Sequence, residues 1–248
     1  MRYALISDIH ANLPALRAVL NDIAKRDIDA IYHLGDLTGY APWPNETVEL
    51  LRERGIPGIA GNYDSTVATG YKHCGCQSEN PEQEKLSHIS YEWTRGHVSA
   101  ETKEFLASLP FRIDIRPLGG HVSGPTITLV HGNQTLNTVY VTEDRTEEFL
   151  SKMASDLGAR ENDAICFGHT HKPWHRVVNG INFINTGSVG RPKDGDWRPC
   201  YVILTAGDAQ LKVEFRRVGY EIDEAVRGIN AAGLPEEFGE QLRGTSPD

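Results

Sequence analysis

The sequence predicts an α/β fold with parallel strands, and the first 60 residues carry that prediction. Short aliphatic or β-branched runs at residues 3–7, 30–34 and 56–60 have the length of buried strands. Residues 14–25 place aliphatic side chains on one face at helical spacing, and Asn12 ahead of them is a typical helix start. Strands that alternate with helices in this way indicate βαβ units and a parallel sheet.

The rest of the chain continues as a mixture of helices and strands. Asn45 is predicted to cap a second helix, and the polar segment 66–110 contains two more, at 82–95 and 100–109. We interpret residues 66–110 as an insertion or lid on a single domain, 1–248, because apolar periodicity distinguishes it from a flexible linker. Further strands are expected at 111–115, 126–130, 164–167, 174–178, 181–185, 201–204 and 211–218, with helices at 143–157 and 223–231 and a polar tail from Pro235.

Composition and charge narrow the class of partner. The 248 residues include 25 Lys and Arg against 34 Asp and Glu, a net charge of −9 that disfavours extended nucleic acid and anionic membranes. No apolar run is long enough for a membrane span or a signal-peptide core, so we expect a cytoplasmic protein. Four cysteines are too few for a disulfide framework, and Cys74, Cys76, Cys166 and Cys200 are predicted to be reduced thiols.

Metal-capable side chains follow five of the predicted strands, in each case just past the carboxyl end. Ligands bind at that edge in open α/β sheets, so we expect these side chains to converge on one crevice. The residues are Asp8, His10, Asp36, Asn62, His131, His169 and His171.

Seven such side chains suit two metal ions better than one. A single zinc ion takes four ligands, and the thiolates of a structural zinc site are absent from this set. Imidazole, carboxylate and amide oxygen favour Mn, Fe, Zn or Co, and a carboxylate such as Asp36 can bridge two ions roughly 3.5–4 Å apart. Two ions held in this way promote hydrolysis of a phosphoester or phosphoanhydride. Any one of these residues alone could be a helix cap or a satisfied polar group, but the ordered set favours function.

Five short blocks resemble, in order, the signature blocks of the calcineurin-like metallophosphoesterases. They are Ser7-Asp8-Ile9-His10, Leu34-Gly35-Asp36, Gly61-Asn62-Tyr63-Asp64, Val130-His131-Gly132 and Gly168-His169-Thr170-His171. A later stretch, residues 185–196, resembles the small bacterial branch that contains YfcE-like phosphodiesterases and diadenosine tetraphosphatase-like enzymes.

This resemblance implies a four-layer α/β/β/α sandwich, in which two mixed β-sheets are flanked by helices. It also implies a division of the ligands between two ions. One ion takes Asp8, His10 and His171, the other takes Asn62, His131 and His169, and Asp36 bridges them.

The third block departs from the family's pattern at one position. Many members have a histidine after the asparagine, and that histidine helps to protonate the leaving group or to stabilise the phosphoryl oxygens, whereas this chain has Tyr63. A tyrosine with a pKa near 10 can donate a hydrogen bond but is poorly matched as a general acid. We therefore expect substrates whose leaving group needs little protonation. The catalytic residues that we predict are Asn62, Tyr63 and Asp64, with Asp64 as an orienting partner.

Substrate contacts are less strongly specified. Gly187 and Ser188 lie in a glycine-rich turn that could present backbone N–H groups to a phosphate, with Arg191 adding charge, although a purely structural turn fits as well. Asn12 could contact phosphate or only cap its helix. The segment 73–76, His-Cys-Gly-Cys, favours an ordinary lid turn over a metal or redox site.

Together these features predict a phosphoesterase with two divalent transition metal ions, Mn favoured over Fe or Zn. It would hydrolyse a small phosphodiester or nucleoside polyphosphate by attack of a metal-bridging hydroxide. A phosphoprotein phosphatase is the alternative within the enzyme class. A non-catalytic scaffold of the same fold is the alternative outside it, but such a scaffold tends to lose metal ligands. No extended nucleic acid or membrane is expected as a partner.

Overall fold

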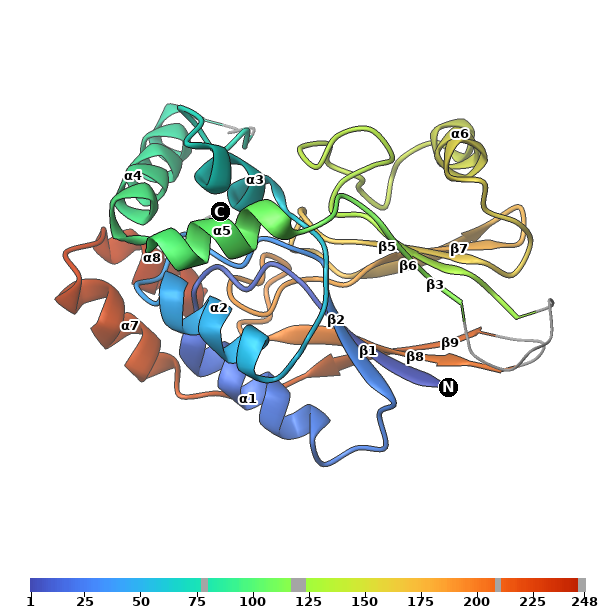
Figure 1. Ribbon diagram of the computed structural model, residues 1–248, viewed down its shortest axis with the longest axis horizontal. Coiled ribbons are helices and arrows are strands. Elements are labelled where there is room, and N and C mark those ends of the chain that lie inside the picture. The colour runs from blue at the N-terminus through green and yellow to red at the C-terminus, as the bar shows by residue number, and fades with distance from the viewer. Residues whose placement is uncertain (77–79, 117–123, 208–210, 245–248) are drawn as a thin grey trace.

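Two mixed β-sheets pack face to face in the computed structural model, which describes residues 1–76, 80–116, 124–207 and 211–244 (Figure 1). In both sheets parallel and antiparallel neighbours occur together. The first sheet has the order β2 (Ala30–His33), β1 (Arg2–Ile6), β8 (Cys200–Ala206) and β9 (Leu211–Arg217). The second has the order β3 (Ile113–Ile115), β4 (Ile127–Leu129), β5 (Ala164–Phe167), β7 (Ile181–Asn185) and β6 (Trp174–Val178).

Helices cover the outer faces of both sheets. In Figure 1, α1 (Leu13–Ile23) lies below the first sheet with α2 (Pro44–Glu53) beside it, and α6 (Glu147–Leu157) lies above the second sheet. This arrangement confirms the four-layer α/β/β/α sandwich. The other helices of the described chain gather at one end: α3 (Asn62–Thr69), α4 (Pro81–His97), α5 (Ala100–Ser108), α7 (Ile222–Ala231) and α8 (Glu236–Arg243).

The alternation of side chains along the central strands produces three apolar layers. In β1, Tyr3 and Leu5 face the core between the sheets, whereas Ala4 and Ile6 face the helices. On the far side of the second sheet, β5 buries side chains against α6. Burial of each large aliphatic side chain stabilises the folded state by about 1.5–3 kcal/mol. Each sheet buries such side chains on both of its faces.

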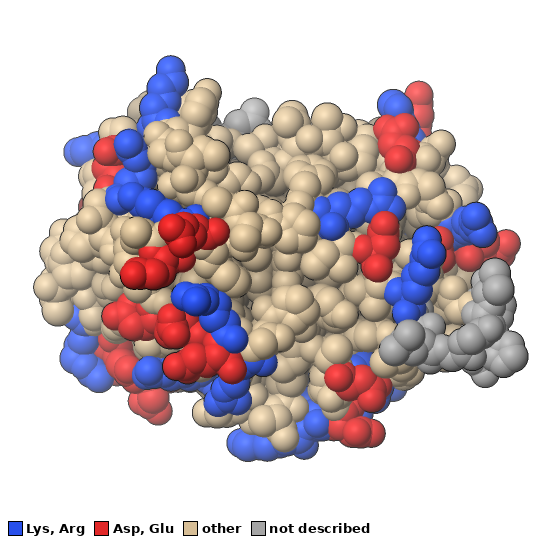
Figure 2. Space-filling model, viewed as in Figure 1, with Lys and Arg blue, Asp and Glu red and all other residues tan. Residues whose placement is uncertain are grey.

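Acidic and basic side chains are interspersed over the face drawn in Figure 2. A continuous basic surface is not visible on that face, in keeping with the net charge of −9. Within the described ranges, no helix combines the length and the apolar character needed to cross a membrane.

The predicted third strand at 56–60 is wrong. Only Gly58 forms an isolated parallel bridge, with His33, and the chain then turns away so that the Ala60 N–H donates to the Pro110 carbonyl. Pro57 has no N–H to donate, so the segment supplies too few ladder hydrogen bonds for a strand.

Two helix boundaries also differ from the predictions. The second helix begins at Pro44, with Trp43 rather than Asn45 at its cap position. Asn45 instead links α2 to α5, because its side-chain oxygen accepts from the Ser99 N–H and the Thr102 hydroxyl, both at 2.8 Å. The helix expected at 143–157 begins at Glu147, capped by Thr146.

The predicted polar tail from Pro235 contains α8. Phe238 and Leu242, one helical turn apart, bury against α7. Two apolar positions in a short charged segment are a weak periodic signal, which is why the sequence pattern did not indicate this helix. Residues 245–248 of the predicted tail lie outside the described residues.

The prediction of four reduced cysteines is half right. Cys166 and Cys200 are free and buried, but Cys74 and Cys76 form a disulfide. Gly75 between them adopts φ +75°, which brings the two Cα atoms to 5.3 Å, within reach of a disulfide. The low number of cysteines in the whole chain does not exclude a single disulfide between two cysteines that a glycine turn brings together.

Candidate metal centre

The carboxyl ends of strands from both sheets meet at one edge of the sandwich. Asp8 follows β1, Asp36 follows β2, His131 follows β4 and His169 follows β5. Because β1 pairs with β2 in parallel and β4 pairs with β5 in parallel, the loops after them converge. The structure brings all seven candidate ligands together there, each no more than 6% exposed.

The backbone of these loops is strained. Five of the seven candidate ligands are non-glycine residues with φ between +48° and +66°: Asp8, His10, Asp36, His169 and His171. The left-handed region costs such residues on the order of 1 kcal/mol or more each, and this strain clusters at functional sites. The surrounding fold therefore stabilises an arrangement that the local backbone disfavours.

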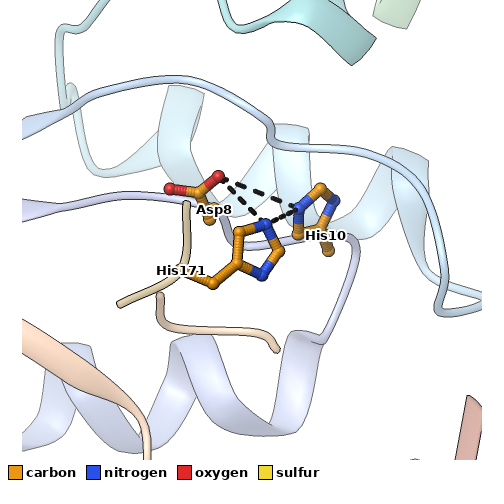
Figure 3. Close-up of side chains that lie close together, drawn as sticks. All are labelled: Asp8, His10 and His171. Carbon is orange, nitrogen blue, oxygen red and sulfur yellow. Dashed lines mark hydrogen bonds and ion pairs between the residues drawn. The ribbon is translucent and has the colours of Figure 1, made fainter. Parts of the chain in front are cut away.

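Asp8, His10 and His171 form the first group of ligands. Their side chains point toward one another in Figure 3. The His171 Nε2 lies 3.3 Å from Asp8 Oδ1, and the His10 Nε2 lies 3.9 Å from the same oxygen. The two Nε2 atoms are 3.1 Å apart. Three donor atoms thus surround one point, as the ligands of a metal ion do.

Hydrogen bonds at the far side of each ring fix which nitrogen faces this point. The Nδ1 of His10 lies 3.0 Å from the Thr38 carbonyl, and the Nδ1 of His171 lies 2.6 Å from the Arg191 carbonyl. A carbonyl can only accept, so each Nδ1 carries the hydrogen. Both neutral rings then direct Nε2 lone pairs at each other, an arrangement that a cation between them stabilises.

Asp36, His131 and His169 form the second group. The Nε2 of His131 lies 3.5 Å from Asp36 Oδ2, and its Nδ1 lies 2.7 Å from the Leu34 carbonyl. The Nε2 of His169 is buried and has no hydrogen-bond partner among the described residues. A buried imidazole nitrogen without a partner is costly, and a metal ion would satisfy it.

Asn62 adds an oxygen to the second group. As the first residue of α3, it places its Oδ1 3.2 Å from the His131 Nε2. Its Nδ2 donates to the Cys74 carbonyl at 3.0 Å and to Cys76 Sγ at 3.4 Å. These contacts turn the amide so that the oxygen, a metal ligand, faces the cluster.

Asp36 lies between the two groups. Its Oδ2 is 3.5 Å from the His131 Nε2 and 3.8 Å from the His10 Nε2. Its other oxygen accepts from the Tyr63 N–H at 2.9 Å. The carboxylate therefore has one oxygen fixed by the backbone and one directed at ligands of both groups, which is the position of a bridging ligand.

Burial sets the protonation of several of these side chains. It lowers the pKa of His10 to about 4 and that of His169 to about 3, so both rings are neutral near pH 7. Burial raises the pKa of Asp8 to about 7. Burial also acts on Asp36 and His131, but their mutual attraction outweighs it, lowering the pKa of Asp36 and raising that of His131 to about 9.

These residues fit a pair of divalent ions. Neutral imidazole, carboxylate and amide oxygen are donors that transition metals accept, and the opposed Nε2 atoms of His10 and His171 have no other evident use. Without bound cations, the closely spaced carboxylates and imidazoles of this buried cluster would repel one another through their lone pairs and charges.

Glycines allow the ligand loops to approach one another. A Cβ atom on Gly168 would lie 2.4 Å from Asp8 Oδ2, and one on Gly61 would lie 2.1 Å from Asp36 Oδ1. Any larger residue at either position would displace a candidate ligand. Gly168 and Gly61 are therefore needed for the close approach of the candidate ligand loops.

Asp64 supports the centre from behind. Its carboxylate accepts from three backbone N–H groups, those of Asp36 at 2.8 Å, Leu37 at 2.9 Å and Gly61 at 2.9 Å. Burial and the neighbouring Asp36 raise its pKa to about 7. With its oxygens used in this way, Asp64 holds the loop of one ligand and caps α3.

Tyr63 is fully buried beside the first group. Its ring meets that of His10 edge-on, with centroids 5.6 Å apart, and its hydroxyl donates to Ser90 Oγ at 3.1 Å. Burial and the neighbouring Tyr40 raise its pKa well above 10. This environment makes proton donation to a leaving group still less favourable than in water.

Three of the four candidate substrate residues are occupied by structural contacts. Asn12 caps α1 through the Ala15 N–H and donates to the Gly190 carbonyl at 2.9 Å. Ser188 donates to the Asp8 carbonyl at 2.7 Å, and the Gly187 N–H donates to Asn185 Oδ1. The glycine-rich turn thus packs against the ligand loop, and none of these three residues lines the cavity above the metal centre.

Arg191 does line that cavity, together with Lys193 and several residues that the sequence did not single out. Tyr140 also lines the cavity, with its ring centroid 4.1 Å from that of His169. We call the part contributed by α4 and α8 the helical wall: Gln83, Leu86 and Ser87 from α4 and Gln241 from α8. No sequence motif marks these four; only the packing of α4 and α8 brings them in.

The comparisons with known proteins agree with this geometry. The family model of the calcineurin-like phosphoesterase superfamily domain matches residues 1–209. The chain belongs to this superfamily.

Three similar proteins extend over almost the whole chain. An uncharacterized protein of Methanocaldococcus jannaschii is 34% identical over 254 residues, 96% of each chain. The crystal structure of a metallophosphoesterase from Sphaerobacter thermophilus is 31% identical, with a TM-score of 0.75 over 99% of this chain and 100% of that one. A hypothetical protein of Pyrococcus horikoshii has the same fold at 20% identity, with a TM-score of 0.82 over 100% of this chain and 99% of that one.

Proposed function

We propose that the protein is a phosphoesterase with two divalent metal ions that hydrolyses a small phosphodiester or a nucleoside polyphosphate. The observation that carries the proposal is the position of Asp36 between two groups of buried ligands, one containing His10 and the other His131. Asp8, His10 and His171 would hold one ion, Asn62, His131 and His169 the other, with Asp36 shared. When bound, such a pair polarises phosphoryl oxygens and provides a nucleophile from water at neutral pH.

The residues around the ligands favour a leaving group that leaves without a strong acid. Tyr63 donates its hydroxyl hydrogen to Ser90 and has a pKa well above 10, so the chain offers little proton donation from this position. An activated phosphodiester or a phosphoanhydride expels a stable anion and needs no such donor. A monoester of an ordinary alcohol does.

The helical wall supports the interpretation of residues 66–110 as a lid over a small substrate. Gln83, Leu86 and Ser87 from α4 lie in the same cavity as the ligands, with Arg191 and Lys193 also on its lining. A small phosphorylated compound can enter between them, whereas an extended polymer would meet the wall. Among the metals, we favour Mn²⁺, because the set combines carboxylate and amide oxygen with imidazole and contains no thiolate.

A substrate screen tests the proposal. The chelated protein is reloaded with Mn²⁺ and assayed with bis(4-nitrophenyl) phosphate, 4-nitrophenyl phosphate, a dinucleoside polyphosphate and a phosphopeptide. We expect the diester and the polyphosphate to be turned over faster than the monoester. Asp36→Asn should lower kcat by more than about 100-fold. Mutation of a residue that only hydrogen-bonds to a metal ligand already lowers metal affinity or activity about 10–100-fold, and Asp36 is itself a candidate ligand.

The control is Asp27→Asn, which changes an exposed carboxylate and should leave kcat unchanged. Absence of turnover with two ions bound would favour the scaffold. Preference for the phosphopeptide would favour a phosphoprotein phosphatase, and a profile dominated by the monoester would contradict our interpretation of Tyr63.

A further inference from the structure

Helix α8 reaches the metal centre although it lies beyond residues 1–209, the part matched by the family model. Gln241 on this helix is buried, and its Oε1 accepts a hydrogen bond from the Arg191 Nη2 at 2.5 Å. Both residues line the cavity that contains the ligands. A glutamine side chain is seldom buried, and a buried one needs a hydrogen-bond partner, which Arg191 supplies here.

Arg191 is held at several points. Its guanidinium lies over the ring of Tyr40, 4.3 Å from the centroid, and Phe238 of α8 meets the same ring edge-on at 5.4 Å. Its backbone carbonyl accepts from the His171 Nδ1 and its N–H donates to Ser188 Oγ. The residue that carries this positive charge therefore also orients a metal ligand.

The chemistry of the contact leaves the charge available. A guanidinium has five N–H donors in a plane, and Gln241 is the only side chain among the described residues that accepts from that of Arg191. A neutral amide oxygen fixes the direction of the group without cancelling its charge, as a carboxylate would. The remaining donors match the spacing of two phosphate oxygens.

We infer that Gln241 is a positioning residue that holds the Arg191 guanidinium toward a phosphoryl group bound at the metal centre. The inference rests on the proposed phosphoesterase function and adds a contribution from the C-terminal helix. Tyr40 supplies the face on which the guanidinium rests, and Gln241 sets its rotation on that face.

Steady-state kinetics of four variants test this role. Gln241→Met keeps the length of the side chain and removes the acceptor; Arg191→Met removes the charge. With bis(4-nitrophenyl) phosphate we expect each single variant to raise KM about tenfold, as loss of a hydrogen bond to a charged group can do, with kcat within about twofold. The double variant should match Arg191→Met alone, because Gln241 acts through Arg191. Glu236→Met, an exposed substitution on α8, is the matched control.

Binding of inorganic phosphate to the metal-loaded proteins, measured by calorimetry, separates this inference from the proposed function. We expect the affinity to fall about tenfold in Gln241→Met and Arg191→Met, and not in Glu236→Met. If the wild type binds phosphate but turns over no ester, the proposed function fails and the comparison of affinities still tests Gln241. Additive effects in the double variant, unchanged affinity in Gln241→Met, or a fall in kcat with loss of metal would overturn the inference.

Discussion

The ligand cluster and the helical wall of the same cavity are built in different ways. The cluster comes from loops that follow parallel strands, with left-handed backbone at positions such as Asp8 and Asp36 and with ring nitrogens tied to backbone carbonyls. The wall comes from α4 and α8, whose side chains enter through helix packing. A strained, backbone-fixed cluster tolerates almost no change, whereas a wall of side chains can vary without loss of the fold. We therefore expect the chemistry to reside in the cluster and the choice of substrate in the wall.

The largest effect is expected from a ligand of the cluster. His131→Ala removes the ring that faces both Asp36 and Asn62, so kcat should fall by more than about 100-fold, with loss of one metal ion per chain. His175→Ala, on the exposed part of β6, is the matched control and should keep kcat. The metal content and kcat of the two purified variants are measured. Equal kcat values for His131→Ala and His175→Ala would contradict the assignment of the chemistry to the ligand cluster.

A glycine substitution tests whether the close approach of the ligand loops matters. In Gly168→Ala the new methyl group would lie 2.4 Å from Asp8 Oδ2, so the affinity for metal should fall on the order of 10–100-fold. Gly96→Ala, in α4 with nothing within 4 Å, should instead stabilise the protein by about 0.5–1 kcal/mol. Metal titration and urea unfolding of both variants provide the readouts. Unchanged metal affinity in Gly168→Ala would show that the loops have room to move.

The smallest effect is expected at Tyr63, the residue next to the cluster whose hydroxyl faces α4. Tyr63→Phe removes only the hydrogen bond to Ser90, so kcat on bis(4-nitrophenyl) phosphate should change less than about threefold and stability by about 1 kcal/mol. Kinetics across diesters with leaving groups of different pKa provide the measurement. A loss that grows steeply as the leaving group worsens would identify the hydroxyl as a proton donor after all.

The difference between cluster and wall also explains how much could be predicted from the sequence. The ligands stand in short motifs just after aliphatic runs, and the edge at which parallel strands end brings such motifs together whatever lies between them. His131 and His171 therefore could be placed in one crevice without any knowledge of the loops. The four-layer architecture could not be derived from strand patterns and came from the resemblance to a family.

The wall could not be predicted, because it depends on contacts between distant segments. Gln241 stands in a stretch with only Phe238 and Leu242 as apolar positions, and the pattern indicated a polar tail. The role of Ser188 was open in the sequence and depends on which way its hydroxyl points, here to the Asp8 carbonyl. Hydrogen-bond direction at a turn is a tertiary property that a motif does not encode.

The number of metal ions bound per chain tests the central claim most directly. Metal-free protein is titrated calorimetrically with Mn²⁺. The account predicts two ions for the wild type and one for His171→Ala, in which the first group loses one of its two opposed Nε2 atoms while the second group stays intact. Binding of no ion or of a single ion by the wild type, or two ions still bound by His171→Ala at unchanged affinity, would contradict the dimetal centre.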